Sequence, residues 1–158
     1  MNKIRLILPT LMLVTLPVLI SLFIYFSNTE KSNPANIVVV QPNIDPYKKF
    51  GSMPPSEQIN RLIHLSDSMG QSNTEYFIWP ETAISQGTEE KTFREDESFK
   101  TIHNFLNEYK NANLSSGIES FSIYDSAATL TARYNKNSGI YFDVFNAAVS
   151  IENSGTLQ

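Results

Sequence analysis

The chain has 158 residues, no cysteine and a formal net charge of −4. This length suits one globular unit, and without cysteine these residues cannot supply a disulfide, a thiolate metal ligand or a cysteine nucleophile. Residues 1–29 carry Lys3 and Arg5 and no acid, whereas the remainder carries all 16 acidic residues. An acidic globular part argues against nucleic acid as a partner, because phosphate contacts need clustered lysine and arginine.

An uncharged apolar run of 21 residues occupies positions 6–26. A helix of about 20 such residues crosses the hydrocarbon core of a bilayer, and membrane helices tolerate internal prolines such as Pro9 and Pro17. We therefore predict a retained transmembrane helix over residues 1–27. A cleaved signal peptide and a buried soluble helix are the alternatives, but the run exceeds the usual signal-peptide core and lacks a small-residue cleavage site after it.

Lys3 and Arg5 precede this run, so the positive-inside rule predicts a cytoplasmic N-terminus and an external globular part. Polar residues 28–36 are predicted to form a linker, and residues 37–158 one domain. Strands are predicted at residues 37–41, 76–79, 114–118, 127–134 and 141–151, and helices at about residues 55–69 and 99–109. Turns are expected at residues 135–139 and 153–155, with a further strand opening at 156–158.

The order of these elements predicts the fold class. A strand–helix–strand–helix order predicts parallel strands joined by crossover helices, and the later run of strands predicts antiparallel pairing. We therefore predict an α/β protein with a mixed sheet. Within it, the strands at residues 37–41 and 76–79 should be adjacent and parallel.

Glu81 is the strongest candidate for chemistry. It follows a short apolar strand and the rigid Pro80, at the position where α/β sheets place their ligands. Neighbouring Phe77 and Trp79 predict apolar surroundings, which favour a general base. A surface-turn glutamate is the alternative.

Other ionisable groups are weaker candidates. His64 and His103 each lie on a predicted helix without a second ligand three or four residues away, so no metal site is predicted there. Residues 89–97 are acidic but lack the regular alternation and glycine of a calcium loop, which predicts a solvated segment. We expect neither a bound metal ion nor a cofactor.

Four segments resemble the carbon–nitrogen hydrolase (nitrilase) superfamily, and within it the apolipoprotein N-acyltransferases. The strand and loop from Ile37 to Phe50, IVVVQPNIDPYKKF, resemble a family strand of the form V-V-Q-x-N-I. Trp79-Pro80-Glu81-Thr82-Ala83 matches the motif W-P-E-[ST]-A. Residues 115–118, SSGI, and 141–148, YFDVFNAA, resemble two later family strands. The segments occur in the family's order behind a membrane helix, over residues 4–158.

The resemblance implies a partial α-β-β-α sandwich behind one transmembrane helix. It implies that Glu81 is the catalytic base, which takes the proton of a thiol so that the thiolate attacks a phospholipid ester. A lysine stabilises the oxyanion, and the acyl chain then passes to the N-terminal cysteine of a lipoprotein. Phospholipid, lipoprotein and membrane lipid are the implied partners, in the bacterial inner membrane with the globular part in the periplasm.

The chain departs from the family's pattern in three ways. It has one membrane helix, and in the family the lysine and the cysteine follow the strand that corresponds to residues 141–151, so both are expected beyond Gln158. Lys136 lies before that strand and is predicted to be a turn lysine. We therefore expect a fragment of the acyltransferase, inactive by itself. The alternatives are a membrane-anchored, non-catalytic nitrilase-like interaction module and a single-span amidase of the same superfamily.

Overall fold

The computed structural model describes residues 3–28 and 34–158, with side chains from residue 9 onward. The chain divides into two compact units, Met1–Pro34 and Ala35–Gln158. The predicted linker at residues 28–36 falls largely on positions outside the described residues, as do the side chains of Lys3 and Arg5, on which the predicted orientation rests.

The first unit contains the helix α1 (Lys3–Ser27). Its segment Pro9–Ser27 has a mean hydropathy of 2.1 and is long and apolar enough to cross a membrane. None of this segment is buried. Pro9 and Pro17 both lie inside the helix, as a membrane helix allows. The structure thus has one candidate membrane span among its described residues.

The second unit contains a mixed six-stranded sheet within residues 34–158. Its strands are β1 (Asn36–Val39), β2 (Thr74–Ile78), β3 (Ile84–Glu89), β4 (Asn113–Tyr124), β5 (Arg133–Asn135) and β6 (Ile140–Ile151). The order is β1-β2-β4-β6-β5, and β3 also pairs with β4. The pairs β1–β2, β2–β4 and β3–β4 are parallel, whereas β4–β6 and β5–β6 are antiparallel. The predicted α/β class with a mixed sheet is confirmed, as is the parallel pairing of the first two predicted strands.

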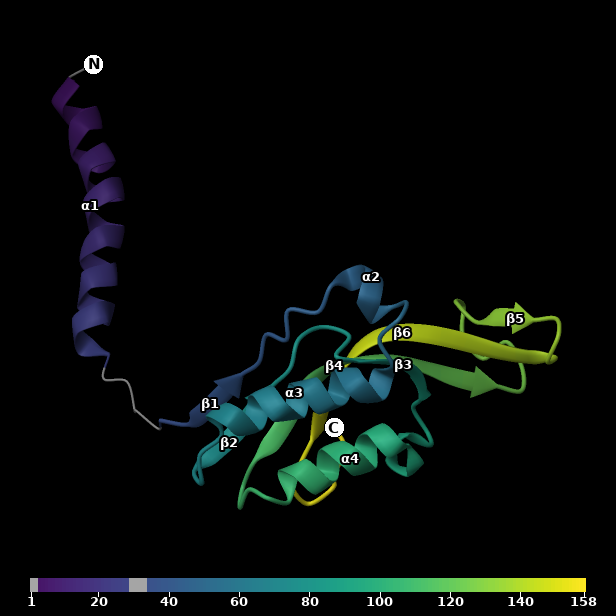
Figure 1. Cartoon of the computed structure of the whole chain (residues 1–158). Coiled ribbons are helices and arrows are strands. Elements are labelled where there is room, and N and C mark those ends of the chain that lie inside the picture. The colour runs from purple at the N-terminus through teal and green to yellow at the C-terminus, as the bar shows by residue number, and fades with distance from the viewer. Residues whose placement is uncertain (1–2, 29–33) are drawn as a thin grey trace. The chain divides into compact units, whose positions relative to one another are not determined.

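Two helices lie across one face of this sheet (Figure 1). They are α3 (Pro55–Met69) and α4 (Glu97–Leu106). Proline at the first position of α3 suits a helix start, because its missing N–H has no partner there. Asp96 caps α4 by accepting a bond of 2.7 Å from the Ser98 N–H, which satisfies one unpaired donor of the first turn. Two shorter segments, α2 (Pro46–Lys49) and the 3₁₀ turn η1 (Phe93–Glu95), lie in the connecting loops.

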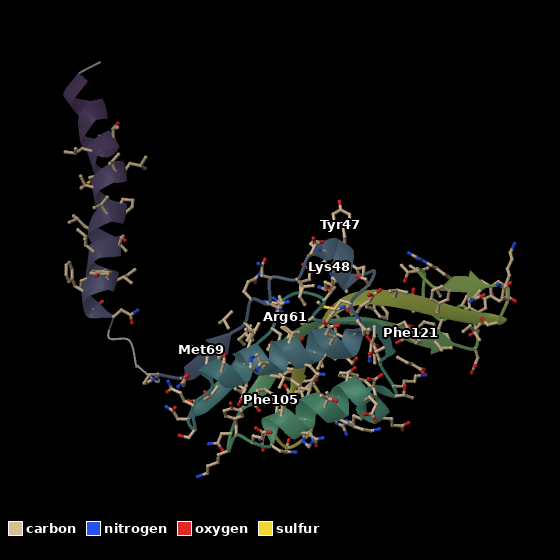
Figure 2. The ribbon with its side chains drawn as sticks, in the orientation of Figure 1. Tyr47, Lys48, Arg61, Met69, Phe105 and Phe121 are labelled. Atoms are coloured by element: carbon tan, nitrogen blue, oxygen red, sulfur yellow. The ribbon has the colours of Figure 1, made fainter. Side chains whose placement is uncertain are left out.

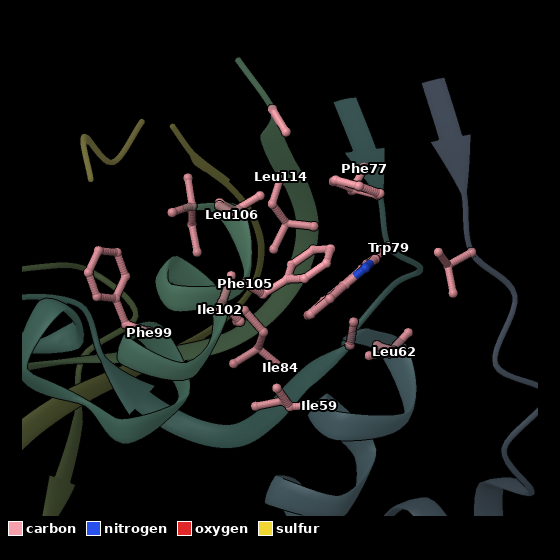
Figure 3. Packing of buried hydrophobic residues seen from close by; sticks show 14 of the residues in the cluster. Ile59, Leu62, Phe77, Trp79, Ile84, Phe99, Ile102, Phe105, Leu106 and Leu114 are labelled. Atoms are coloured by element: carbon pink, nitrogen blue, oxygen red, sulfur yellow. The ribbon is translucent and has the colours of Figure 1, made fainter. Parts of the chain in front are cut away.

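The core lies between the helices and this face of the sheet (Figure 3). Alternation along β4 buries Leu114, Ser116 and Ile118 toward the helices, because successive strand residues point to opposite faces. Phe77 and Trp79 are buried beside them. The opposite face of the sheet leaves apolar side chains in solvent, among them Ile37, Val39, Tyr76 and Val144.

Several predicted elements were wrong in extent. The strand predicted at residues 127–134 is reduced to Arg133–Asn135, because Thr129 binds Asp143 of β6 through its side chain, at 2.5 Å, and makes no backbone ladder. The second helix ends at Leu106 and not at Tyr109. The other predicted strands are present. β3 and α2 were not predicted. β4 extends six residues past the predicted end at Ile118, to Tyr124.

Candidate functional site

Glu81 lies in the turn that joins β2 to β3, directly after the carboxyl end of β2. Two backbone bonds attach this turn to β4: Trp79 N–H donates to the Ser115 carbonyl at 2.9 Å, and Gly117 N–H donates to the Pro80 carbonyl at 3.2 Å. The β2–β3 turn therefore continues the sheet contact beyond the end of β2. Its position is set by β4 and not by the loop alone.

Gly117 allows the Glu81 turn to lie directly on β4. A Cβ atom at position 117 would lie 2.6 Å from the Cα of Glu81 and 2.5 Å from the backbone nitrogen of Thr82. Backbone atoms cannot be displaced as cheaply as the end of a side chain, so only glycine permits this approach. Gly117 belongs to one of the motif segments, and the structure gives it a role in seating Glu81.

Asn146 of β6 contacts the Glu81 carboxylate. Its Nδ2 donates to Oε1 of Glu81 at 2.6 Å. Both residues are exposed, so water reaches this carboxylate while one of its oxygens is oriented by the amide. A hydrogen bond to a charged acceptor is shorter and stronger than one between neutral groups.

Lys49, at the end of α2, approaches the same turn from another segment. Its Nζ donates to Thr82 Oγ1 at 2.6 Å and to the Glu81 carbonyl at 3.1 Å. Partial burial lowers the pKa of Lys49 by disfavouring its charged form, and the negative charge of Glu81 opposes this by raising that pKa. The Lys49 ammonium is therefore close enough to Glu81 for their charges to interact, although its hydrogen bonds are to the Glu81 carbonyl and the Thr82 hydroxyl.

A cavity of about 160 Å³ adjoins Glu81. Its walls include Pro42 and Asn43 from the loop after β1, Gln58 and Leu62 from α3, and Lys49. Since a water molecule takes about 30 Å³ of liquid volume, the cavity accommodates a small polar group.

The aromatic surroundings expected for Glu81 were wrong. Phe77 and Trp79 turn into the core on the helical side of the sheet (Figure 3). The indole Nε1 of Trp79 donates to Ser66 Oγ at 2.9 Å. A continued strand would place residue 81 on the same face as residues 77 and 79. β2 ends at Ile78, however, so Glu81 lies in the following turn and its side chain does not follow the alternation.

The other candidates lie elsewhere. His64 is exposed on α3, and His103 on α4 has its Nε2 3.2 Å from the Asn153 carbonyl. Lys136 lies in the β5–β6 turn. Within the acidic stretch, Glu90 accepts bonds from Ser120 and Ser122, each at 2.9 Å. In the described part of the chain, no three histidine, aspartate or glutamate side chains are grouped as metal ligands.

Comparison with known proteins gives one informative similarity. No family model matches the chain. Apolipoprotein N-acyltransferase of Chlorobaculum tepidum is 34% identical over 86 residues, which are 52% of this chain. The chain covers only 16% of that relative's length. The similarity supports a relationship with this family for part of the chain.

The structure brings together residues from all four motif segments: Lys49, Glu81, Gly117 and Asn146. Sequence reasoning singled out Glu81 but assigned no role to Lys49 or Asn146. Both stood in the quoted segments, so the signal was present. What the sequence alone lacked was the pairing of β4 with β6, which carries Asn146 to the Glu81 turn.

Proposed function

We propose that residues 37–158 form the base-bearing part of an enzyme related to apolipoprotein N-acyltransferase, anchored by α1 in the bacterial inner membrane. The observation that carries this proposal is the position of Glu81. It stands in the sequence Trp79-Pro80-Glu81-Thr82-Ala83, at the end of a parallel strand, with its carboxylate oriented by Asn146. The 86-residue similarity to the named relative supports the same assignment.

In the proposed reaction, Glu81 takes the proton of a cysteine thiol. The thiolate attacks the ester carbonyl of a phospholipid, the lysophospholipid leaves, and a thioester forms. The α-amine of a lipoprotein's N-terminal cysteine then attacks the thioester, which gives the amide and restores the thiol. The 158 residues contain no cysteine, so the thiol is supplied by a segment outside them, and we propose the same for the oxyanion-stabilising lysine. The chemistry calls for no cofactor.

The location follows from the proposed anchor. Lys3 and Arg5 precede the apolar helix, so we propose a cytoplasmic N-terminus and a periplasmic globular unit. Phospholipid and lipoprotein N-termini are both available on that side of the membrane. We propose the boundaries 1–27, 28–36 and 37–158 for the anchor, the linker and the partial carbon–nitrogen hydrolase domain.

The proposal is tested by supplying the missing groups. The coding sequence is extended in the same reading frame with the genomic DNA that flanks it on both sides, and the longer protein is expressed. This protein is assayed for the transfer of labelled acyl chains from phospholipid to a diacylated lipopeptide. Glu81→Gln keeps the shape and removes the base, so the rate should fall by roughly 10²–10⁴-fold. Glu108→Gln, an exposed acid between α4 and β4, is the matched control and should retain the rate.

A non-catalytic, membrane-anchored interaction module is the second candidate. The observation in its favour is that the 158 residues contain no cysteine. It predicts that the flanking DNA adds neither a lysine–cysteine pair nor activity. A single-span amidase would instead hydrolyse simple amides with the same dependence on Glu81, and would leave lipopeptides unmodified.

A further inference from the structure

The turn that carries Glu81 contains an unfavourable backbone conformation. Thr82 has a φ of +47°, in the left-handed region. For a residue with a Cβ this conformation costs roughly 1–2 kcal/mol, and β-branched residues such as threonine adopt it least readily. Such a conformation persists only where its surroundings hold it.

Lys49 makes the contacts that hold this turn from the side of α2. Its ammonium binds the side chain of Thr82 and the carbonyl of Glu81, so both ends of the Glu81–Thr82 peptide unit are fixed by one group. The ring of Phe50 lies 5.3 Å from the same ammonium, within the range of a cation–π interaction. These contacts order the lysine side chain.

The backbone of Lys49 is itself anchored to the core. Gln58, 1% exposed, donates from Nε2 to the carbonyls of Lys49 and Met53 at 2.7 and 3.0 Å. Ser85 of β3 donates to Oε1 of the same amide at 3.3 Å. Buried polar groups with several partners specify one arrangement. The position of the Lys49 ammonium is therefore determined by α3 and β3 as well as by its own short helix.

We propose that Lys49 is a positioning residue for Glu81: it holds the Glu81–Thr82 turn so that the carboxylate remains within reach of Asn146. The relevance of this to catalysis rests on the proposed function, but the positioning itself is a property of this chain. The exposed neighbour Lys48 provides a matched control, since it lies on the same short helix. Tyr47 and Lys48 project from α2 in Figure 2.

The test uses the full chain, isotope-labelled in detergent micelles. The first readout is the Asn146 side-chain amide proton, whose chemical shift reports the bond to Glu81. Lys49→Met should move this resonance toward the value of a solvated amide and should speed amide exchange at Thr82. Lys49→Arg should restore most of the shift, and Lys48→Met should leave it unchanged. An unaltered Asn146 resonance in a folded Lys49→Met chain overturns the proposal.

The single tryptophan shows whether each variant is folded, since Trp79 is 4% exposed. If Lys49→Met does not fold, Thr82→Val decides, because it removes the Oγ1 acceptor and keeps the β-branched shape. Loss of the Asn146 shift in Thr82→Val supports the proposal, and its retention overturns it. None of these readouts requires acyl transfer. If they give the expected results and the extended protein still fails the acylation assay, the proposed function is refuted and the positioning role of Lys49 stands.

Discussion

Asn146 Nδ2 lies 2.6 Å from Oε1 of Glu81, although 65 positions separate the two residues in the chain. β6 presents the amide and the β2–β3 turn presents the carboxylate, and β4 lies between them in the sheet. The contact makes the carboxylate sensitive to the chemistry of position 146. Measurements on the Asn146 side-chain amide therefore report the geometry of the site.

Asn146→Asp should destabilise the globular unit at neutral pH more than Asn146→Ala does. The aspartate places a second negative charge beside Glu81, whereas alanine leaves an exposed carboxylate to water. The difference between the two variants should shrink as salt is added, because salt screens the repulsion between exposed charges. Denaturant titrations followed by Trp79 fluorescence measure it. Equal midpoints for the two variants at neutral pH would show that the residues are not in contact.

Gly117→Ala should destabilise the globular unit by about 1–3 kcal/mol, the usual cost of forcing an extra carbon into a packed site. The new Cβ would meet the backbone of Glu81 and Thr82 at 2.5–2.9 Å. The same Trp79 titration measures this, and the Asn146 amide resonance should shift as the turn is displaced. Ser115→Ala, two residues earlier on the same face, is the control and should have little effect on either quantity.

Tyr109 should make stability fall at high pH. Burial, together with its bond of 2.7 Å to Asp67, raises the pKa of Tyr109 to about 12, against about 10 in the unfolded chain. The folded state then holds the phenolic proton more tightly, so this stabilisation is fully present below pH 10 and is lost as the pH rises through about 12. Stability measured over this range should decline less steeply in Tyr109→Phe. Tyr47→Phe, at a position 92% exposed, should behave as the wild type.

The apolar helix should retain the chain in membranes. The protein is expected to sediment with bacterial membranes and to resist extraction by alkaline carbonate. The double variant Leu16→Lys, Leu19→Lys should release it, since each lysine near a membrane centre costs about 2.5–3.5 kcal/mol. The corresponding double alanine variant should remain bound. Recovery of a soluble product beginning near residue 28 would identify a signal peptide instead.

Sequence patterns were sufficient for the parts of the fold with strong periodicity. The β-branched residues of β1 predicted a strand, and the spacing of Ile59 and Leu62 in α3 predicted a packed helix; both are present. The expectation that this strand is buried on both faces was wrong, because Ile37 and Val39 are exposed. β3 escaped prediction because Ile84 is its one large apolar side chain and Gly87 interrupts it. The end of β4 escaped because Ser120 and Ser122 occupy its buried positions, where Glu90 binds their hydroxyls.

Of the residues in the candidate site, only Glu81 was predicted from the sequence. Glu81 follows an apolar strand and a proline, which is a local pattern, and its motif added to the same signal. The contributions of Lys49, Gly117 and Asn146 depend on contacts between segments that are distant in sequence. Local periodicity carries no information about such contacts. For Gly117 the pairing of β2 with β4 supplies this information, and for Asn146 the register of β4 against β6 supplies it.

That register has a consequence for how the site comes into being during folding. Glu119 pairs with Asn146 and Gly117 with Ala148 across the two strands. A shift of β6 by one residue would turn Asn146 toward the helices and present Ala147 in its place, because the side-chain period of a strand is two. Pairing β6 with β4 requires the chain to close the loop between them, at a cost in conformational entropy. A misaligned chain could therefore bury Trp79 normally and still leave Glu81 without its amide partner.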